Sequence, residues 1–230
     1  MHFLSFFDII DKMYFYENIN RRYTLKKQFI ASKAKEKTSR QQQAEQTKKK
    51  LLSVSLELMK AQGFENVKIS DICEKVGVST GAFYHHLTNK AGIVIEAYDQ
   101  CDQYFKNSVS PIFADRYDID AIADYIDYQI QYAIDMGADL TTQMYKAQLQ
   151  YGTEFFLSQE RGLPNGLLTI IRNLQEHQIL SSDKSAEALT NEFLVISRGV
   201  LYNWCLNNGS YDPKSFSHEI IAAHLKAYTL

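Results

Sequence analysis

Proline and glycine are scarce in this chain of 230 residues, which contains 3 and 10 of them. Both residue types enforce turns and end helices, so their scarcity favours long helices over many short strands. Alternation of apolar and polar residues never extends beyond a few positions, and no internal repeat is present. We therefore expect an all-α fold.

Cysteine is sparse too. Cys73, Cys101 and Cys205 lie far apart in the sequence, and no pair has the CxxC spacing. These positions form neither a disulfide framework nor a zinc ligand set, and three small buried hydrophobic residues in a reducing cytoplasm are the favoured interpretation. We expect a cytoplasmic protein without a metal site or a cofactor.

An uncharged apolar run long enough to span a bilayer is missing from the start of the chain. The opening MHFLSFFDIIDKMYFY is apolar and aromatic, but Asp8, Asp11 and Lys12 interrupt it, and no small-residue cleavage site follows. The segment therefore has the form of neither a signal peptide nor a transmembrane helix. An interfacial helix stays open, but a helix packed on the protein itself, or a tail added by an upstream start codon, is favoured. We expect no membrane partner.

Charge is nearly balanced overall, at a formal −2, but it is unevenly distributed. Residues 1–106 carry 17 Lys and Arg against 12 Asp and Glu, whereas residues 107–230 carry 8 against 15. Such asymmetry is typical of a basic region that binds a polyanion, joined to an acidic body that does not. Residues 21–50 alone hold 11 Lys and Arg, which indicates either a solvated helix or flexible arm, or an arm that binds phosphates.

Apolar residues at helical spacing divide the chain into helices. The first lies in TKKKLLSVSLELMKAQGF and ends near Gly63, and two short helices follow, with a tight turn at Gly77 and an N-cap at Ser79. Asn89 caps a helix that extends to Phe105. Long helices are predicted beyond residue 111, over residues 118–136 and 138–151, from the RGLPNG turn to about 177, and over 185–207 and 214–228.

Two short helices joined by a tight turn, with a third helix before them, form a helix-turn-helix unit. The turn needs a residue that tolerates positive φ, such as Gly77, and Val78 fills the junction between the helices. The small residues from Ser79 to Ala82 allow the second helix to enter the major groove of DNA.

The segment ISDICEKVGVSTGAFYHHLTNKAGIVIEAY resembles the DNA-binding signature of the TetR family of bacterial transcriptional regulators. The similarity covers roughly residues 45–105, and its many spaced positions make it far more specific than a short motif. Four departures from the signature are Cys73 for alanine, Thr80 for Lys or Arg, Leu87 for an aromatic and Ala91-Gly92 for an acidic pair. The matching positions are Ile69, Asp71, Ile72, Gly77, Val78, Ser79, Gly81, Phe83, Tyr84, His85, Asn89 and Lys90.

The resemblance implies which residues contact DNA. Thr80 and Gly81 lie where the recognition helix meets base edges, the hydroxyl of Tyr84 reaches a phosphate, and His85 donates to a phosphate or a base. Lys90, at a helix N-terminus, combines a cation with free backbone N–H groups. The complete predicted set is Lys68, Ser70, Ser79, Thr80, Gly81, Tyr84, His85 and Lys90.

Metal binding and catalysis are not favoured by the sequence. His85 and His86 are neighbours that point about 100° apart on a helix, so they do not share an ion; His86 is predicted to pack at the helix junction. The aspartates between residues 115 and 127 lack the glycine and the terminal glutamate of a calcium loop. Because no nucleophile–base pair or phosphate loop is present either, we expect no catalytic residues, no metal and no enzyme.

The aromatic residues of the C-terminal half are ordinary core residues when taken singly, but as a set they offer pocket walls with polar tips. Arg172, His177 and Arg198 are either charged anchors for a ligand or surface residues. The predicted ligand-binding set is Tyr125, Tyr128, Tyr132, Tyr145, Phe155 and Trp204.

Three segments follow from these patterns: an extension over residues 1–44, a DNA-binding domain over 45–106, and a helical ligand-binding and dimerisation domain over 107–230. The resemblance implies a repressor that binds a palindromic operator in double-stranded DNA as a homodimer, with the last two helices paired. A small-molecule effector would release it by moving the helix over residues 90–105. The alternative is a TetR-like coactivator or scaffold whose C-terminal domain binds a protein partner.

Overall fold

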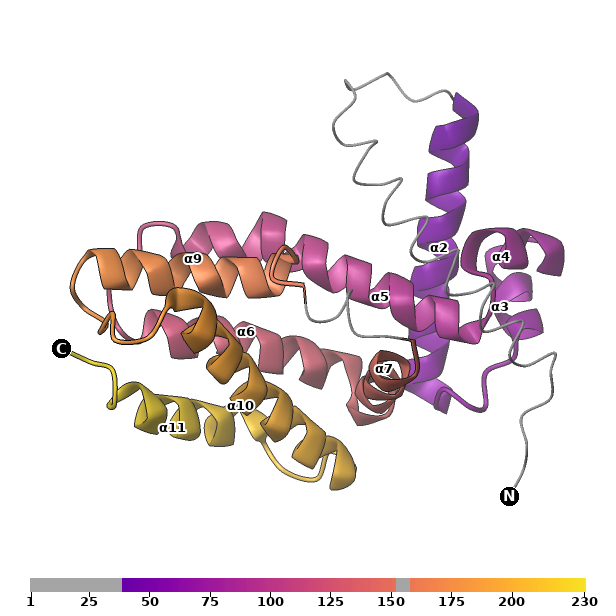
Figure 1. The fold of residues 1–230 in the computed structure, drawn as a ribbon. Coiled ribbons are helices and arrows are strands. Elements are labelled where there is room, and N and C mark those ends of the chain that lie inside the picture. Colours follow the sequence, from indigo (N-terminus) through magenta and orange to yellow (C-terminus); the bar gives the residue numbers. More distant parts are fainter. Residues whose placement is uncertain (1–38, 152–157) are drawn as a thin grey trace. The chain divides into compact units, whose positions relative to one another are not determined.

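A computed structural model describes residues 39–151 and 158–230 (Figure 1). The chain divides into two compact units, Met1–Gln46 and Thr47–Leu230. The apolar opening and most of the basic arm lie outside the described residues. Within the described ranges the regular structure is helical, and pairing of extended backbone is limited to one isolated bridge between Leu180 and Thr229. The expected all-α fold is confirmed.

The turn and the N-caps of the helix-turn-helix unit lie where the sequence places them, whereas its first helix begins at Ser39, ahead of the predicted segment from Thr47. The turn glycine, Gly77, has φ 79°, the Ser79 hydroxyl accepts a hydrogen bond from the backbone N–H of Ala82 at 3.2 Å, and the Asn89 side chain accepts one from Gly92 N–H at 2.9 Å. Both predicted N-caps are therefore confirmed. The helices concerned are α2 (Ser39–Gln62), α3 (Ile69–Val76), α4 (Thr80–Leu87) and α5 (Lys90–Tyr104).

The C-terminal helices also match the predicted ranges closely. α9 packs against α5 and α6, and both α6 and α10 pack against α11 (Figure 1). The helices are α6 (Ala121–Met136), α7 (Ala138–Tyr151), α9 (Gly162–Glu176), α10 (Ala186–Leu206) and α11 (Pro213–Leu225).

The segment after α5 differs from the prediction. The chain continues from α5 into a π-helical turn, Phe105–Val109, and then into a 3₁₀ turn, Ser110–Phe113. Phe105, Val109 and Phe113, each four residues apart, are all buried in the C-terminal core. Side chains four residues apart also share one face of an α-helix, so this apolar spacing does not distinguish the two helix types. Periodicity alone therefore does not predict where the α-helix gives way to π and 3₁₀ turns.

Two hydrophobic cores are present in the described part of the chain, and α7 contributes to the N-terminal one. That core contains the inward faces of α2 to α5 and also Leu140, Met144 and Ala147 of α7, together with Met136 at the end of α6. The other core is built from the π and 3₁₀ turns and from α6, α9, α10 and α11. A helix distant in sequence thus completes the packing of the helix-turn-helix unit.

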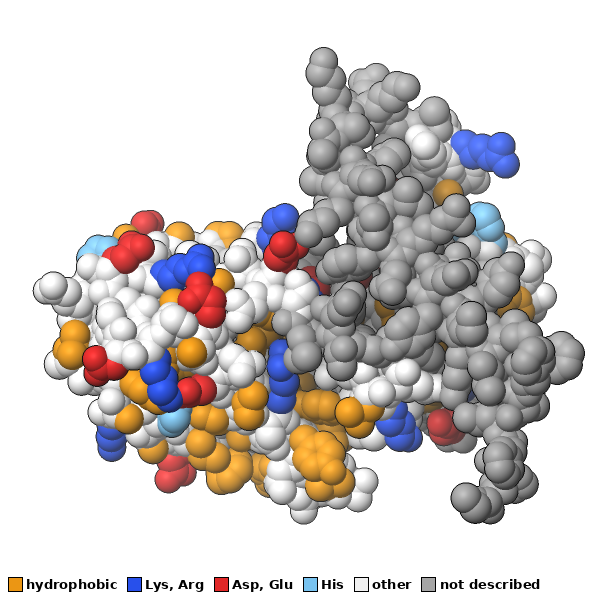
Figure 2. Space-filling view, viewed as in Figure 1, with side chains coloured by type: hydrophobic (Ala, Val, Ile, Leu, Met, Phe, Trp, Pro, Cys, Tyr) orange, Lys and Arg blue, Asp and Glu red, His pale blue; other side chains and the backbone are white. Residues whose placement is uncertain are grey.

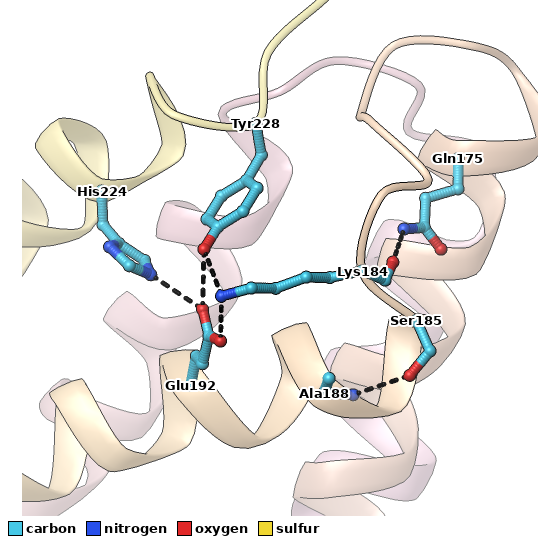
Figure 3. A network of polar contacts seen from close by, with 7 residues as sticks. All are labelled: Gln175, Lys184, Ser185, Ala188, Glu192, His224 and Tyr228. Carbon is cyan, nitrogen blue, oxygen red and sulfur yellow. Dashed lines mark hydrogen bonds and ion pairs between the residues drawn. The ribbon is translucent and has the colours of Figure 1, made fainter.

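A polar network fastens the last helix to α10 (Figure 3). Glu192 of α10 lies at its centre: one carboxylate oxygen accepts from the Tyr228 hydroxyl at 3.0 Å and contacts His224 Nε2 at 3.2 Å. Lys184 binds the other oxygen of Glu192 and donates to the Tyr228 hydroxyl at 2.7 Å. The α9–α10 loop and the end of α11 are therefore held on the same turn of α10.

Candidate nucleic-acid interface and cavity

Helix α4 separates a buried face from an exposed polar face. Phe83 and Leu87 are buried in the N-terminal core, as expected for side chains four residues apart on one face. The Tyr84 side chain is 53% exposed. This exposure is high for an aromatic residue and shows that Tyr84 is not part of the core. The exposed face carries Thr80, Gly81, Tyr84 and His85.

The junction between α4 and α5 depends on a glycine whose role was missed by sequence reasoning. A Cβ atom added to Gly92 would lie 1.8 Å from the backbone oxygen of Leu87. Leu87 O already accepts a hydrogen bond from Asn89 N–H at 2.7 Å, so the chain folds back tightly at this point. The close backbone approach thus requires a residue without a side chain at Gly92, while nothing in the structure explains Ala91.

The flanking residues of the predicted interface hold one another in place. Lys68 N–H and the Ser70 hydroxyl both donate to the Asp71 carboxylate, at 3.2 and 3.1 Å. Lys90 Nζ donates to the backbone oxygen of Glu65 at 3.2 Å and lies 4.7 Å from the centre of the Phe64 ring. Lys90, which is predicted to bind a DNA phosphate, therefore also connects α5 to the α2–α3 loop.

The two adjacent histidines occupy different environments, as expected. His85 is exposed and His86 is half-buried, with their ring centres 5.3 Å apart. Burial, followed by the nearby charges of His85 and Lys48, lowers the pKa of the His86 imidazole. This environment favours the neutral form of the His86 imidazole.

A cavity of about 90 Å³ lies among α5, α6, α7, α9 and α10. A single water needs roughly 10–15 Å³ on this measure, so the cavity has room for a small organic molecule. Its walls combine aromatic, aliphatic and polar side chains with two arginines. They are formed by Tyr98, Cys101, Gln129, Tyr132, Ala133, Thr141, Met144, Tyr145, Gln148, Arg161, Leu163, Pro164, Arg198 and Leu201.

Only part of the predicted aromatic set reaches this cavity. Tyr132 and Tyr145 line it, whereas Tyr125, Tyr128 and Trp204 lie outside its walls. The Tyr125 hydroxyl donates to Leu163 O at 3.1 Å within the core. Tyr128 packs edge-on against the Phe113 ring, and Trp204 Nε1 donates to Tyr211 O at 3.0 Å. Phe155 falls outside the described residues.

The reason for this division is tertiary. Tyr125, Tyr128 and Tyr132 share a stripe of one helix, but the stripe runs from the centre of the C-terminal core towards the cavity. Helical spacing identifies the stripe without showing where along it the packing leaves space. The structure therefore assigns Tyr125, Tyr128 and Trp204 to core packing.

Beside the cavity lies a buried ion pair that the sequence analysis did not identify. The Arg161 guanidinium donates two hydrogen bonds to the Asp102 carboxylate, from Nε at 2.8 Å and from Nη2 at 3.0 Å. Burial raises the pKa of Asp102 while the hydrogen bonds from Arg161 oppose that rise. The partners lie 59 residues apart in the sequence, so no local pattern announces them.

One group in the described residues has the geometry of potential metal ligands. Oxygens of Asp124 and Asp127 and a ring nitrogen of His218 lie within 4.8 Å of one another. His218 already contacts Asp127 at 3.3 Å, and Arg116 donates to Asp124 at 2.6 Å. These contacts give the group a structural role in joining α6 and α11.

Comparison with known proteins agrees with the geometry of the N-terminal helices. Residues 51–97 match the model of the bacterial regulatory proteins, tetR family. The helix-turn-helix domain belongs to the TetR family. This match confirms the resemblance over residues 51–97. No curated protein matches the chain.

Solved structures extend the likeness to the helical C-terminal part. FadR of Thermus thermophilus, a TetR-family repressor in complex with lauroyl-CoA, is 18% identical, with a TM-score of 0.62 over 77% of this chain and 92% of that one. FadR of Bacillus subtilis in complex with stearoyl-CoA is 14% identical, with a TM-score of 0.57 over 77% and 97%. SmeT in complex with triclosan is 16% identical, with a TM-score of 0.55 over 80% and 92%. At these identities the likeness shows a shared fold.

Among the helices that the structure describes, none is both long and apolar enough to cross a bilayer.

Proposed function

We propose that this TetR-family chain is a ligand-responsive transcriptional regulator, a repressor that binds a palindromic operator as a dimer and is released by a small molecule. The observation that carries the proposal is the exposed polar face of α4, within a domain that matches the family model. Polar side chains at the start of a recognition helix are suited to base edges and phosphates.

The proposed DNA-contacting residues differ in how they meet the duplex. Thr80 and Gly81 read base edges, while Tyr84 and His85 contact phosphates or an adjacent base. Lys90 keeps two N–H donors beyond the one given to Glu65, and with Lys68 it contacts the phosphate backbone. The remaining members of the set are Ser70 and Ser79. The proposed domains remain residues 1–44, 45–106 and 107–230.

Dimerisation is supported by apolar side chains that the single chain leaves exposed. Val195, Tyr202 and Leu206 of α10 are 58%, 53% and 62% exposed, and Gly199, also exposed, lies between them at the same helical spacing. On α11, Phe216 is exposed as well. Hydrophobic side chains gather over these two helices in Figure 2. Two such stripes, paired with their symmetry mates, form a four-helix bundle.

Tyr202→Glu is expected to convert the protein into a monomer. Each protomer of a two-fold dimer contributes one such glutamate, so two unpaired charges would be buried in the interface. We therefore expect the dissociation constant of the dimer to rise by at least about 100-fold. Size-exclusion chromatography with light scattering at micromolar concentration measures the change. Leu149→Glu, at an exposed leucine of α7 outside the stripe, is the matched control and stays dimeric. A variant Tyr202→Glu that remains a dimer would place the interface elsewhere.

Helix α7 supports the coupling between ligand and DNA. Its buried residues complete the hydrophobic core of the helix-turn-helix unit. Its Asp139 carboxylate accepts a hydrogen bond from the backbone N–H of Phe64, in the α2–α3 loop, at 2.6 Å. Thr141, Met144 and Tyr145 of the same helix line the cavity. A ligand that favours a different position of α7 thereby favours a different position of the helix-turn-helix unit.

The experiment that tests the proposal is footprinting on the DNA upstream of the chain's own gene and its neighbours. We expect protection of an inverted repeat, with its half-sites separated by about one helical turn or a multiple of it. Binding should weaken steeply with salt because phosphate contacts release counterions. If no sequence is protected at concentrations that saturate non-specific binding, the DNA-binding part of the proposal is wrong.

A further inference from the structure

We infer that the cavity binds a small organic anion, a carboxylate carried on an apolar or aromatic body, and that Arg198 of α10 is its anchor. The inference rests on the proposed ligand-responsive function, because it names the chemical class of the effector.

The charges around the cavity do not balance. Two guanidinium groups, those of Arg161 and Arg198, line it, and none of its described wall residues is acidic. The nearby Asp102 carboxylate accepts two hydrogen bonds from Arg161. Among the residues that the structure describes, the guanidinium of Arg198 has no ion pair and no hydrogen-bond partner. Within the described part of the chain, the positive charge of the half-buried Arg198 therefore has no paired counterion.

Arg198 is half-buried, so its guanidinium is partly removed from water. Burial, followed by the positive charge of Arg161, lowers the pKa of the Arg198 guanidinium. Buried charges in proteins are ordinarily paired, because removal from water is expensive unless a partner compensates. A bound anion removes both penalties at once, and a guanidinium offers a planar fork that matches a carboxylate.

The position of Arg198 is itself held. The Tyr145 hydroxyl donates to the backbone oxygen of Arg198 at 2.9 Å, which joins α7 to α10 at the cavity wall. A ligand bound to Arg198 thus acts on α7, the helix that also packs against the helix-turn-helix unit.

The rest of the wall indicates what the anion carries. Met144, Leu163 and Leu201 are aliphatic, and the rings of Tyr132 and Tyr145 lie among them, which suits an apolar or aromatic body. Gln129, also in the wall, has a buried side-chain oxygen that accepts no hydrogen bond from the described chain. A hydroxyl on the ligand would satisfy it. The volume of about 90 Å³ limits the body to about the size of one aromatic ring or a short alkyl chain.

The test compares each carboxylate with its neutral amide on the full-length protein. Calorimetric titration and thermal denaturation are run with benzoate against benzamide, 4-hydroxybenzoate against 4-hydroxybenzamide, and octanoate against octanamide. We expect at least one carboxylate to bind and to raise the melting temperature, while its amide, equal in shape and lacking charge, binds at least about 10-fold more weakly.

Arg198→Gln is expected to weaken binding of that carboxylate by about 10- to 100-fold and to leave the affinity for its amide unchanged. Arg172→Gln, at an exposed arginine paired with Glu187, is the control and retains full affinity. If Arg198→Gln does not fold, the comparison of carboxylate with amide on the wild-type protein still decides the matter.

Three results would overturn the inference: no carboxylate binds, the amides bind as tightly as the acids, or Arg198→Gln binds the acids unchanged. A gel shift with operator DNA, run separately, tests the proposed function. Protein that binds a carboxylate but no DNA refutes the regulator and leaves the anion site standing. Protein that binds operator DNA but no carboxylate refutes the anion site and leaves the proposed DNA-binding function standing.

Discussion

Replacing Gly81 by glutamate is expected to lower the affinity for operator DNA at least about 100-fold without harming the fold. Gly81 lies on the exposed face of α4, and the nearest atom to a Cβ there is the Ser79 hydroxyl oxygen at 3.8 Å, an ordinary contact. A carboxylate in the first turn of a helix is favourable. In the major groove, however, the added bulk and negative charge lie where the helix approaches the base edges and phosphates, and a two-fold dimer suffers that repulsion in both half-sites.

Fluorescence anisotropy with a labelled operator fragment measures this effect, and thermal denaturation checks the fold. Gly81→Ala, which adds only a methyl group, should keep the melting temperature and lose far less affinity. Thr169→Glu, at an exposed position of α9, controls for the added negative charge. Equal affinities for Gly81→Glu and Thr169→Glu would mean that α4 does not enter the groove.

Asp102→Ala is expected to lower the free energy of unfolding by about 3–5 kcal/mol. The substitution leaves the buried Arg161 guanidinium without the carboxylate that accepts its two hydrogen bonds, and an uncompensated buried charge has about that cost. The loss is large compared with the total stability of a typical domain. Urea denaturation, followed by circular dichroism, gives the difference.

The matched control is Glu187→Ala. It breaks the Arg172–Glu187 pair, whose side chains are 52% and 46% exposed, and should cost no more than about 1 kcal/mol because water screens and solvates both groups. If the two substitutions cost the same, the Arg161–Asp102 pair is not the stabilising contact that its burial indicates.

Much of the helix-turn-helix unit was predictable because its determinants are local. The N-caps at Ser79 and Asn89 and the positive φ of Gly77 are requirements of single residues and their immediate neighbours. The spacing of Phe83 and Leu87 likewise identifies the buried face of α4, and therefore the face left for DNA. The role of Gly92 was not predictable, because it comes from the path of the chain at the α4–α5 junction.

The cavity shows the opposite case. Helical spacing correctly identified a tyrosine stripe on α6, yet Tyr132 alone of its three members lines the cavity. Arg198, which the sequence left undecided between anchor and surface residue, gains its meaning from the pairing of Arg161 with Asp102. That ion pair joins α5 to the start of α9, and no sequence pattern in either segment predicts it.

The amino-acid sequence by itself determined the helices, their caps, the family of the DNA-binding domain and the face of α4 that is exposed. These depend on backbone preferences and on periodicities within one helix. Tertiary structure alone decided that α7 belongs to the core of the DNA-binding unit and which aromatic residues line the cavity. It also decided which arginine of the cavity wall has no ion-pair partner among the described residues. Those outcomes depend on packing between distant segments, where space and charge balance are properties of several helices at once.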